Sequence, residues 1–253
     1  MLRTRVIPIV LLDSNYSVVK TIQFDVRRKL GNPIVVSRIY DTRVVDELVL
    51  LDIDASKEGR GIDLYTIEAV SSECFMPLII GGGLRTCGDI ERTLRAGADK
   101  VSLNSVIFER PGFLKEAVSV FGSQCIVASI DVKKDEEGNY KPFSHSDRDV
   151  KYSLEEYIKL VMGFGVGEIL LQNVDRDGTM KGYDLQLINR VSSFMNIPLI
   201  VSGGLSEPRD CISAIKAGAS AVAASSIFHF TQFTPEICKH FLAEADIPVR
   251  IQR

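Results

Sequence analysis

The amino-acid sequence predicts a single closed barrel of eight parallel strands, each followed by a helix, that is, a (β/α)8 fold over residues 1–253. Three observations support this fold class. Short β-branched runs alternate with helix-like segments along the chain. The length of 253 residues is typical of such a barrel, which commonly uses about 250 residues in one domain. Parallel strands need helical crossovers that cover both faces, which leaves an open doubly wound sheet or a closed barrel, and eight near-regular units favour the barrel.

The strand-like runs set the order of the predicted elements. They begin near Arg5, Asp46, Pro77, Asp99, Cys125, Gly167, Pro198 and Ala221. The segments between them carry apolar residues at helical spacing and often end at glycine, as helix C-termini do. The predicted helices include 62–72, 89–96, 154–162 and 208–217. Two long polar segments, 13–32 and 133–153, follow the first and fifth runs, and we expect either mobile lids over the barrel mouth or merely flexible surface loops.

The two halves of the sequence repeat each other. Successive strand starts are separated by 41, 31 and 22 residues from Arg5 to Asp99, and by 42, 31 and 23 residues from Cys125 to Ala221. The stretch AGAD at 96–99 recurs as AGAS, and IGGGL at 80–84 recurs as VSGGL, each 121 residues later. One common offset predicts two fused half-barrels, about 1–121 and 122–253.

The composition excludes several classes of protein. With 45% apolar and 25% charged residues, the chain is neither disordered nor fibrous. A net charge of -3 gives no general attraction for nucleic acid or anionic membranes. No apolar run reaches the roughly 18 residues of a membrane span and no signal peptide is recognisable, so we expect a cytoplasmic protein. Five scattered cysteines without a C-x-x-C pair predict free thiols, and three histidines without metal-ligand spacing predict no metal or cofactor.

Glycine, serine and asparagine residues at strand ends predict two anion sites. The third run ends in the glycines 81–83 and the fourth in 104–105, while the seventh ends in 202–204 and the eighth in 225–226. Bare backbone amides and a following helix N-terminus favour phosphate, and a ligand with a phosphate at each end matches the symmetry. Tight strand-to-helix turns are the alternative explanation for the glycines. The candidate phosphate-binding residues are Gly82, Gly83, Asn104, Ser105, Gly203, Gly204, Ser225 and Ser226.

Carboxylates at strand ends are the candidates for proton transfer. Asp131 ends the fifth run, where its carboxylate would reach the barrel mouth as a general acid or base. Asp177 and Gly178 follow the sixth run and either bind ligand hydroxyls or form a turn. Asp52 and Asp54 end the second run.

Charged residues begin four of the strands, at the opposite end of the barrel. At one depth near the axis they could pair as a ring that closes the barrel, because buried charges need partners. Separate surface charges are the alternative, since strand residues alternate between inside and outside. The four residues are Arg5, Glu47, Lys100 and Glu168, which alternate in sign.

Along nearly its whole length the sequence resembles the cyclase subunit of imidazole glycerol phosphate synthase, the barrel enzyme of histidine biosynthesis. The matching stretches are 45–53, 97–104, 121–124, 167–171, 175–179 and 228–230. The resemblance implies a partner glutaminase subunit on the N-terminal face, ammonia passing through the barrel, and a bis-phosphorylated ribulosyl substrate cleaved and cyclised at the other face. It implies an ammonia gate at Arg5, Glu47, Lys100 and Glu168, a glutaminase contact at Asp99, substrate binding by Lys20 in the first loop, and Asp131 as one of two catalytic aspartates.

The other catalytic aspartate of the family is missing. Family members end the first strand in Cys-Leu-Asp-Val-Lys-Asp-Gly, whereas this chain places Leu11 or Leu12 at the aspartate position. Leucine cannot transfer a proton, and losing one general acid or base costs about 100-fold to 10,000-fold in rate. Asp13 is the candidate replacement if the loop folds back. Gln172 and Asn173 also replace small hydroxyl residues that are usual at the end of the sixth strand.

These departures resemble a divergent branch found in bacterial surface-polysaccharide clusters. There, a similar barrel and its glutaminase supply ammonia to an ATP-dependent partner that turns a sugar acetamido group into an acetamidino group. Two functions are therefore open: a lyase and cyclase that forms imidazole glycerol phosphate and aminoimidazole carboxamide ribotide, or an ammonia conduit to an ATP-dependent synthetase in lipopolysaccharide-type biosynthesis. The single-chain isomerase of the histidine pathway also has a duplicated barrel, but it leaves residues 228–230 and the four charges unexplained.

Overall fold

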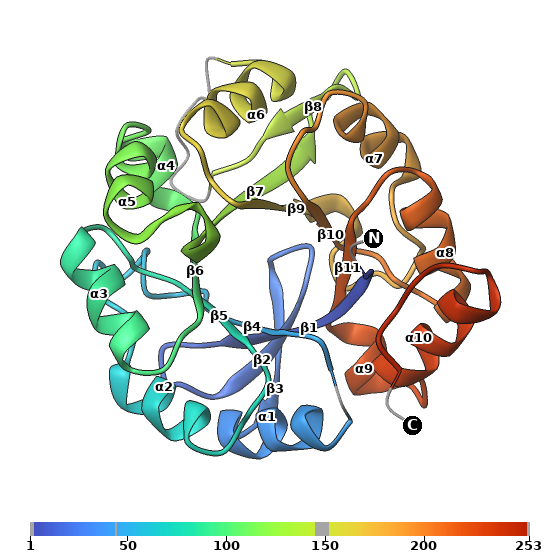
Figure 1. Ribbon diagram of the computed structural model, residues 1–253, viewed down its shortest axis with the longest axis horizontal. Coiled ribbons are helices and arrows are strands. Elements are labelled where there is room, and N and C mark those ends of the chain that lie inside the picture. Colours follow the sequence, from blue (N-terminus) through green and yellow to red (C-terminus); the bar gives the residue numbers. More distant parts are fainter. Residues whose placement is uncertain (1–2, 44, 145–151, 252–253) are drawn as a thin grey trace.

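A computed structural model describes residues 3–43, 45–144 and 152–251 of the chain. Within these residues, eight parallel strands close into a barrel, because β1 pairs with β4 on one side and with β11 on the other (Figure 1). The strands follow one another around the barrel in chain order. The predicted (β/α)8 fold is thereby confirmed. The barrel strands are β1 (Arg5–Leu12), β4 (Leu48–Asp52), β5 (Leu78–Gly81), β6 (Lys100–Leu103), β7 (Ile126–Lys134), β9 (Glu168–Asn173), β10 (Leu199–Ser202) and β11 (Ala221–Ala224).

Helices form the outer layer of the barrel (Figure 1). Their first turns follow the sequence: Thr86 and Ser153 each form a capping box, which satisfies backbone amides that a helix leaves free. The four helices whose limits we predicted agree with the structure to within two residues at each end. None of the helices in the described part of the chain has the length and apolar character needed to cross a bilayer. The helices are α1 (Pro33–Thr42), α2 (Leu64–Ser71), α3 (Cys87–Arg95), α4 (Ser105–Glu109), α5 (Phe113–Phe121), α6 (Leu154–Gly163), α7 (Leu185–Ser192), α8 (Pro208–Lys216), α9 (Ser226–Phe230) and α10 (Pro235–Glu244), with short 3-10 turns η1 (Ser123–Cys125) and η2 (Val174–Arg176).

The two long polar segments contain strands, which corrects the expectation of irregular loops. The first forms an antiparallel hairpin of β2 (Val18–Ile22) and β3 (Val26–Gly31), and β2 also pairs with the end of β1. The second begins with the extension of β7, which pairs with β8 (Tyr140–Pro142). These ladders satisfy backbone groups that a loop would leave to solvent. Residues 145–151 of the second segment lie outside the described residues.

Residues alternate between the inside and the outside of the barrel along each strand. On β1, Ile7, Ile9 and Leu11 belong to the small apolar cluster inside the barrel, whereas Val10 and Leu12 belong to the larger cluster between strands and helices. The period of two therefore puts Arg5, at the start of the same strand, on the inner face.

Corresponding positions in the two halves make the same contacts. A Cβ on Gly97 would lie 2.4 Å from the Ser71 hydroxyl oxygen, and a Cβ on Gly218 would lie 2.4 Å from that of Ser192. Ser71 donates a hydrogen bond of 2.9 Å to the carbonyl of Ala96, and Ser192 donates one of 2.8 Å to the carbonyl of Ala217; each acceptor is the first residue after a helix, α3 or α8. These matched contacts, 121 residues apart, support the proposal of two duplicated half-barrels, about 1–121 and 122–253.

Candidate functional site

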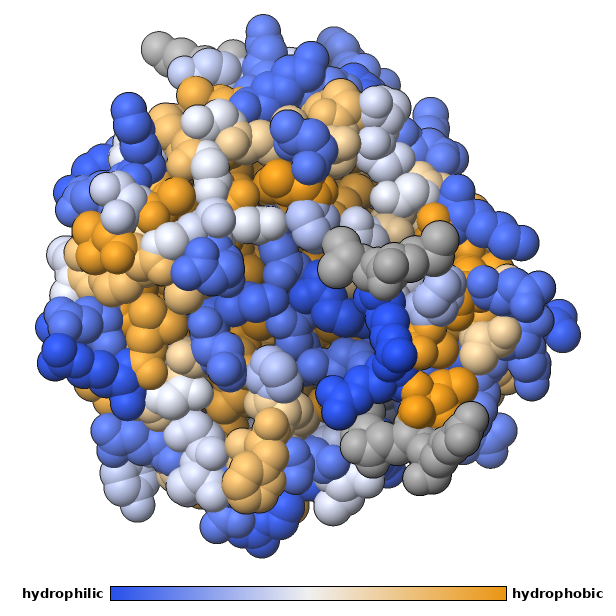
Figure 2. Space-filling model, viewed as in Figure 1, coloured by the Kyte–Doolittle hydropathy of each residue, from blue (hydrophilic) through white to orange (hydrophobic). Residues whose placement is uncertain are grey.

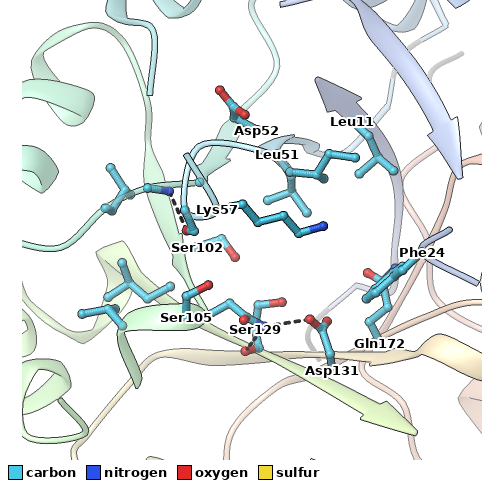
Figure 3. Close-up of a pocket in the computed structure, with 18 of the residues that line it drawn as sticks. Leu11, Phe24, Leu51, Asp52, Lys57, Ser102, Ser105, Ser129, Asp131 and Gln172 are labelled. Atoms are coloured by element: carbon cyan, nitrogen blue, oxygen red, sulfur yellow. Dashed lines mark hydrogen bonds between the residues drawn. The ribbon is translucent and has the colours of Figure 1, made fainter. Parts of the chain in front are cut away.

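A cavity of about 120 Å³ opens at the carboxyl-terminal ends of the first five barrel strands (Figure 3). A second, smaller cavity of about 20 Å³ lies at the ends of β9, β10 and β11. Gln172 lines both cavities. The predicted site residues divide between them: Gly82, Gly83, Asn104, Ser105 and Asp131 line the first, and Lys20, Asp177, Gly178, Gly203, Gly204, Ser225 and Ser226 line the second.

The second cavity contains polar groups suited to an anion. The hydroxyls of Ser225 and Ser226 are buried, and neither has a hydrogen-bond partner among the residues that the structure describes. A buried hydroxyl without a partner costs free energy, which a ligand oxygen would recover. Lys20 lies in β2 rather than in a loop, with its side chain 4% exposed and its Nζ 3.1 Å from Asp177 Oδ1. Thr21 donates a second hydrogen bond to Asp177, at 2.8 Å, so the hairpin is tied to the far side of the barrel mouth.

In the first cavity, the local backbone conformation is by itself enough to explain the glycines at positions 82 and 83. Gly82 and Gly83 have φ angles of 118° and 67°, in the region that favours glycine. A Cβ on Gly82 would lie 2.4 Å from the Asp52 carbonyl oxygen. The tight-turn explanation therefore accounts for these glycines, and a phosphate role rests on their position in the wall beside Asn104 and Ser105.

Asp131 is the acidic group best placed for proton transfer. Its side chain is buried in the cavity wall and accepts a hydrogen bond of 3.0 Å from Asn104 Nδ2 (Figure 3). Burial raises the pKa of Asp131 to about 7, although the Asn104 hydrogen bond opposes the shift and the charge of Asp177 adds to it. A carboxyl group that titrates near neutral pH can both give and take a proton.

Of the two leucines expected at the position of the family's first aspartate, Leu11 is the one that faces the cavity. Leu11 lines the cavity (Figure 3), while Leu12 packs behind the strand. Asp13 is buried in the turn after β1, where its carboxylate accepts hydrogen bonds from the amides of Asn15 and Ser17 at 2.9 and 3.0 Å. It does not line the cavity, so its position gives no support to the prediction that it replaces the acid.

Several lining residues were not predicted from the sequence. The hairpin supplies Phe24 and Arg27, and the loop after β4 supplies Lys57. Arg27 makes two hydrogen bonds of 2.6 Å to Asp54, and that guanidinium holds the pKa of Asp54 below its ordinary value. Recognising β2 and β3 as a hairpin that returns to the barrel mouth would have brought two of these residues into the site.

Four charges meet at the amino-terminal end of the barrel axis. Arg5 pairs with Glu47 and with Glu168, both at 2.5 Å, and Lys100 pairs with the same two carboxylates at 2.6 and 2.5 Å. The alternative of separate surface charges is thus excluded. Figure 2 shows hydrophilic side chains gathered around the centre of the molecule, the part of the view that the barrel occupies in Figure 1.

The charge ring stabilises the ionised forms of Arg5, Lys100 and Glu168. Burial lowers the pKa of Arg5, but hydrogen bonds and charges from Glu168 and Glu47 raise it above its ordinary value. The pKa of Lys100 is raised above its ordinary value by the same two carboxylates, again against the effect of burial. Burial raises the pKa of Glu168, but the two cations bring it below its ordinary value. Asp99, the predicted glutaminase contact, directly precedes β6 at the same end of the barrel, where it accepts a hydrogen bond of 2.8 Å from the Leu78 amide.

Comparison with known proteins agrees with this geometry. The family model described as "Histidine biosynthesis protein" matches residues 5–234. The chain is also 46% identical over 254 residues to a Campylobacter jejuni protein named "Putative imidazole glycerol phosphate synthase subunit hisF2". That similarity covers 99% of this chain and 100% of the relative.

Proposed function

This chain belongs to the histidine biosynthesis protein family, and we propose that within it the chain is the barrel subunit of a glutamine amidotransferase complex. A glutaminase subunit docks on the amino-terminal face, near Asp99. The ammonia that it releases crosses the barrel and reacts with a phosphorylated acceptor at the other face. Such a complex works in the cytoplasm, where the five free cysteines stay reduced.

The observation that carries this proposal is the ring of Arg5, Glu47, Lys100 and Glu168. Apolar side chains would close the end of a barrel at no loss of stability, because burying ion pairs costs desolvation free energy. A charge ring therefore favours a role in transport. Beyond the ring the barrel interior is apolar, which disfavours ammonium ions and admits neutral ammonia.

At the barrel mouth the proposed roles follow from the two cavities. The residues at the strand ends hold phosphate groups, with Lys20 and the Ser225 and Ser226 hydroxyls at the smaller cavity. Asp131 transfers protons as ammonia adds to the acceptor, since its pKa of about 7 makes both forms available at neutral pH. In a reaction like that of imidazole glycerol phosphate synthase, Asp131 would act without an acid at the position of Leu11, because Asp52, which also lines the cavity, is paired with Arg60.

A second candidate is favoured by Leu11. Because this apolar side chain occupies the position of the first acid, the barrel would serve as a conduit that delivers ammonia to an ATP-dependent synthetase, as in acetamidino sugar formation. Both candidates share the ammonia-receiving step and differ in the acceptor.

Turnover of the ribulosyl substrate with ammonium chloride at alkaline pH separates the candidates. If the chain is a cyclase, the native barrel turns over slowly, and Leu11→Asp raises the rate by about 100-fold, the usual contribution of one general acid or base. Leu11→Asn is the matched control, because the asparagine side chain is close in size to aspartate and is not acidic. Absence of product from both the native barrel and Leu11→Asp rejects the cyclase and leaves the conduit.

The shared claim is tested with the glutaminase itself. We expect the barrel to co-purify with it and to increase glutamine hydrolysis. Lys100→Met should uncouple hydrolysis from amination of the acceptor while the barrel stays folded, and Lys115→Met, on the outer surface of α5, should change neither. Glutaminase activity that is indifferent to the barrel would refute the claim.

A further inference from the structure

Gln172 lies between the two cavities at the barrel mouth. Among the residues that the structure describes, it alone lines both of them. On β9, Leu170 lies inside the barrel and Leu171 packs outside, so the period of two points Gln172 inward. Its Cα pairs with that of Asp131 on β7 and with that of Ser202 on β10, a residue of the smaller cavity. A ligand that reaches from one cavity to the other must therefore pass Gln172.

The side-chain amide of Gln172 has no partner within the described part of the chain. The residue is 5% exposed, and no hydrogen bond among the described residues involves its side chain. The amide of Asn173 is used inside the fold instead, because it donates a hydrogen bond of 3.1 Å to Asp184. Figure 3 shows Gln172 on the same side of the larger cavity as Asp131. The Gln172 amide is therefore left to the contents of the cavities, which are solvent in the free protein and ligand in the complex.

An amide in this position favours hydroxyl groups on a ligand. Its NH2 group donates and its carbonyl oxygen accepts, and a hydroxyl can do both in return. The candidate phosphate-binding residues lie to either side of Gln172, in the larger and in the smaller cavity, so the middle of a ligand meets the amide. A hydrocarbon chain there would displace solvent from the amide without replacing its hydrogen bonds, which lowers affinity. A chain that carries hydroxyls replaces them.

We propose that Gln172 is a specificity-determining residue that binds a hydroxyl in the middle of an open-chain sugar with a phosphate at each end, and that it thereby holds the middle of the ligand beside Asp131. The ribulosyl substrate of the turnover experiment belongs to this class of ligand. The proposal deepens the proposed function, and it rests on that function only in identifying the bound molecule as the acceptor of ammonia.

Three probes separate the contribution of the phosphates from that of the hydroxyls. Sorbitol 1,6-bisphosphate carries hydroxyls between its two phosphates, hexane-1,6-diol bisphosphate has the same length and none, and sorbitol 6-phosphate has a single phosphate. Isothermal titration calorimetry measures the affinity of the purified full chain for each. We expect sorbitol 1,6-bisphosphate to bind about tenfold more tightly than either of the other two, because they lack the hydroxyls or the second phosphate.

Variants show whether Gln172 causes the preference for hydroxyls. Methionine is close to glutamine in length and has no amide, so Gln172→Met should reduce the preference between the two bisphosphates to less than about twofold. Its affinity for hexane-1,6-diol bisphosphate should stay within about twofold of native, because that probe offers the amide no hydroxyl. Gln186→Met, on the exposed face of α7, is the matched control and should keep the native preference. Circular dichroism melting checks that each variant folds.

Several results would overturn the proposal. They are equal affinity of the native chain for the two bisphosphates, no gain from the second phosphate, no binding of any probe below about 10 mM, and an undiminished preference in Gln172→Met. An equal loss of affinity for both bisphosphates in Gln172→Met would also overturn it, because the residue would then only support the cavity wall. None of these measurements involves ammonia or the glutaminase. A failure here therefore leaves the coupling experiments unaffected, and a failure of coupling leaves the binding preference intact.

Discussion

Replacing Asp131 by Asn should change how the stability of the protein depends on pH. The carboxyl group is buried, and its pKa rises from an ordinary 3.8 to about 7 mainly because burial disfavours the charged form. Between these two values the folded chain holds a proton that the unfolded chain has released. The free energy of unfolding therefore falls as pH rises through this range and levels off above pH 7. Asparagine has nearly the same shape and does not titrate, so Asp131→Asn lacks this contribution.

The size of the effect follows from the two pKa values. Each tenfold change in proton affinity is equivalent to about 1.4 kcal/mol. The shift in pKa from 3.8 to about 7 therefore corresponds to roughly 4 kcal/mol of unfolding free energy once the pH is above the pKa of the folded state. Relative to native protein, Asp131→Asn should gain roughly 4 kcal/mol in stability between pH 4 and pH 8. Every other titrating group is common to both proteins, so its contribution cancels in the difference.

Urea unfolding at several pH values between 4 and 8, followed by circular dichroism, measures this difference. The midpoint difference between the two proteins should widen steadily up to about pH 7 and then stay constant. A difference that is flat across this range would show that Asp131 titrates near its ordinary pKa, and it would remove the reason for assigning it proton transfer at neutral pH.

Two further predictions concern stability and are measured by the same unfolding assay. Gly203→Ala should lower the free energy of unfolding by about 2–4 kcal/mol, because Gly203 has a φ of 97° and a Cβ there would lie 2.5 Å from the Asn173 carbonyl oxygen. The control is Gly163→Ala, where a Cβ would have no atom within 4 Å, and it should lower the free energy of unfolding by less than about 0.5 kcal/mol. Lys100→Met should lower the free energy of unfolding by about 2–4 kcal/mol, because it leaves Glu47 with one partner. The double variant Lys100→Met with Glu47→Gln should lose less stability than the sum of the two single variants. Additive losses of stability would contradict the charge ring.

Much of the fold was predictable because its signals are local. Strand starts and helix limits such as 154–162 follow from β-branched runs, apolar spacing and capping residues, and the structure confirms them. The hairpin of β2 and β3 was missed because β3 is exposed along most of its length and shows no apolar alternation. Its pairing with β2, and the return of the hairpin to the barrel mouth, are set by tertiary contacts such as that of Lys20 with Asp177.

The site was predictable where strand geometry determines it. The period of two that puts Arg5 inside the barrel also puts Leu11 inside and Leu12 outside, so the choice between these leucines could have been made from the sequence. The position of Lys57 could not, because it depends on the path of the loop after β4 and no motif marks it. Asp13 was open for the same reason, since a turn decides which atoms its carboxylate meets.

The central claim is that ammonia passes from a glutaminase through this barrel to the acceptor. The most direct measurement supplies the complex with glutamine labelled with nitrogen-15 in its amide, together with excess unlabelled ammonium, and determines the label in the aminated product by mass spectrometry. We predict that the product of the native complex carries the label whatever the concentration of unlabelled ammonium, and that Lys100→Met admits unlabelled nitrogen. A label that falls in proportion to added ammonium in the native complex would show that ammonia reaches the acceptor from bulk solution and would contradict the account.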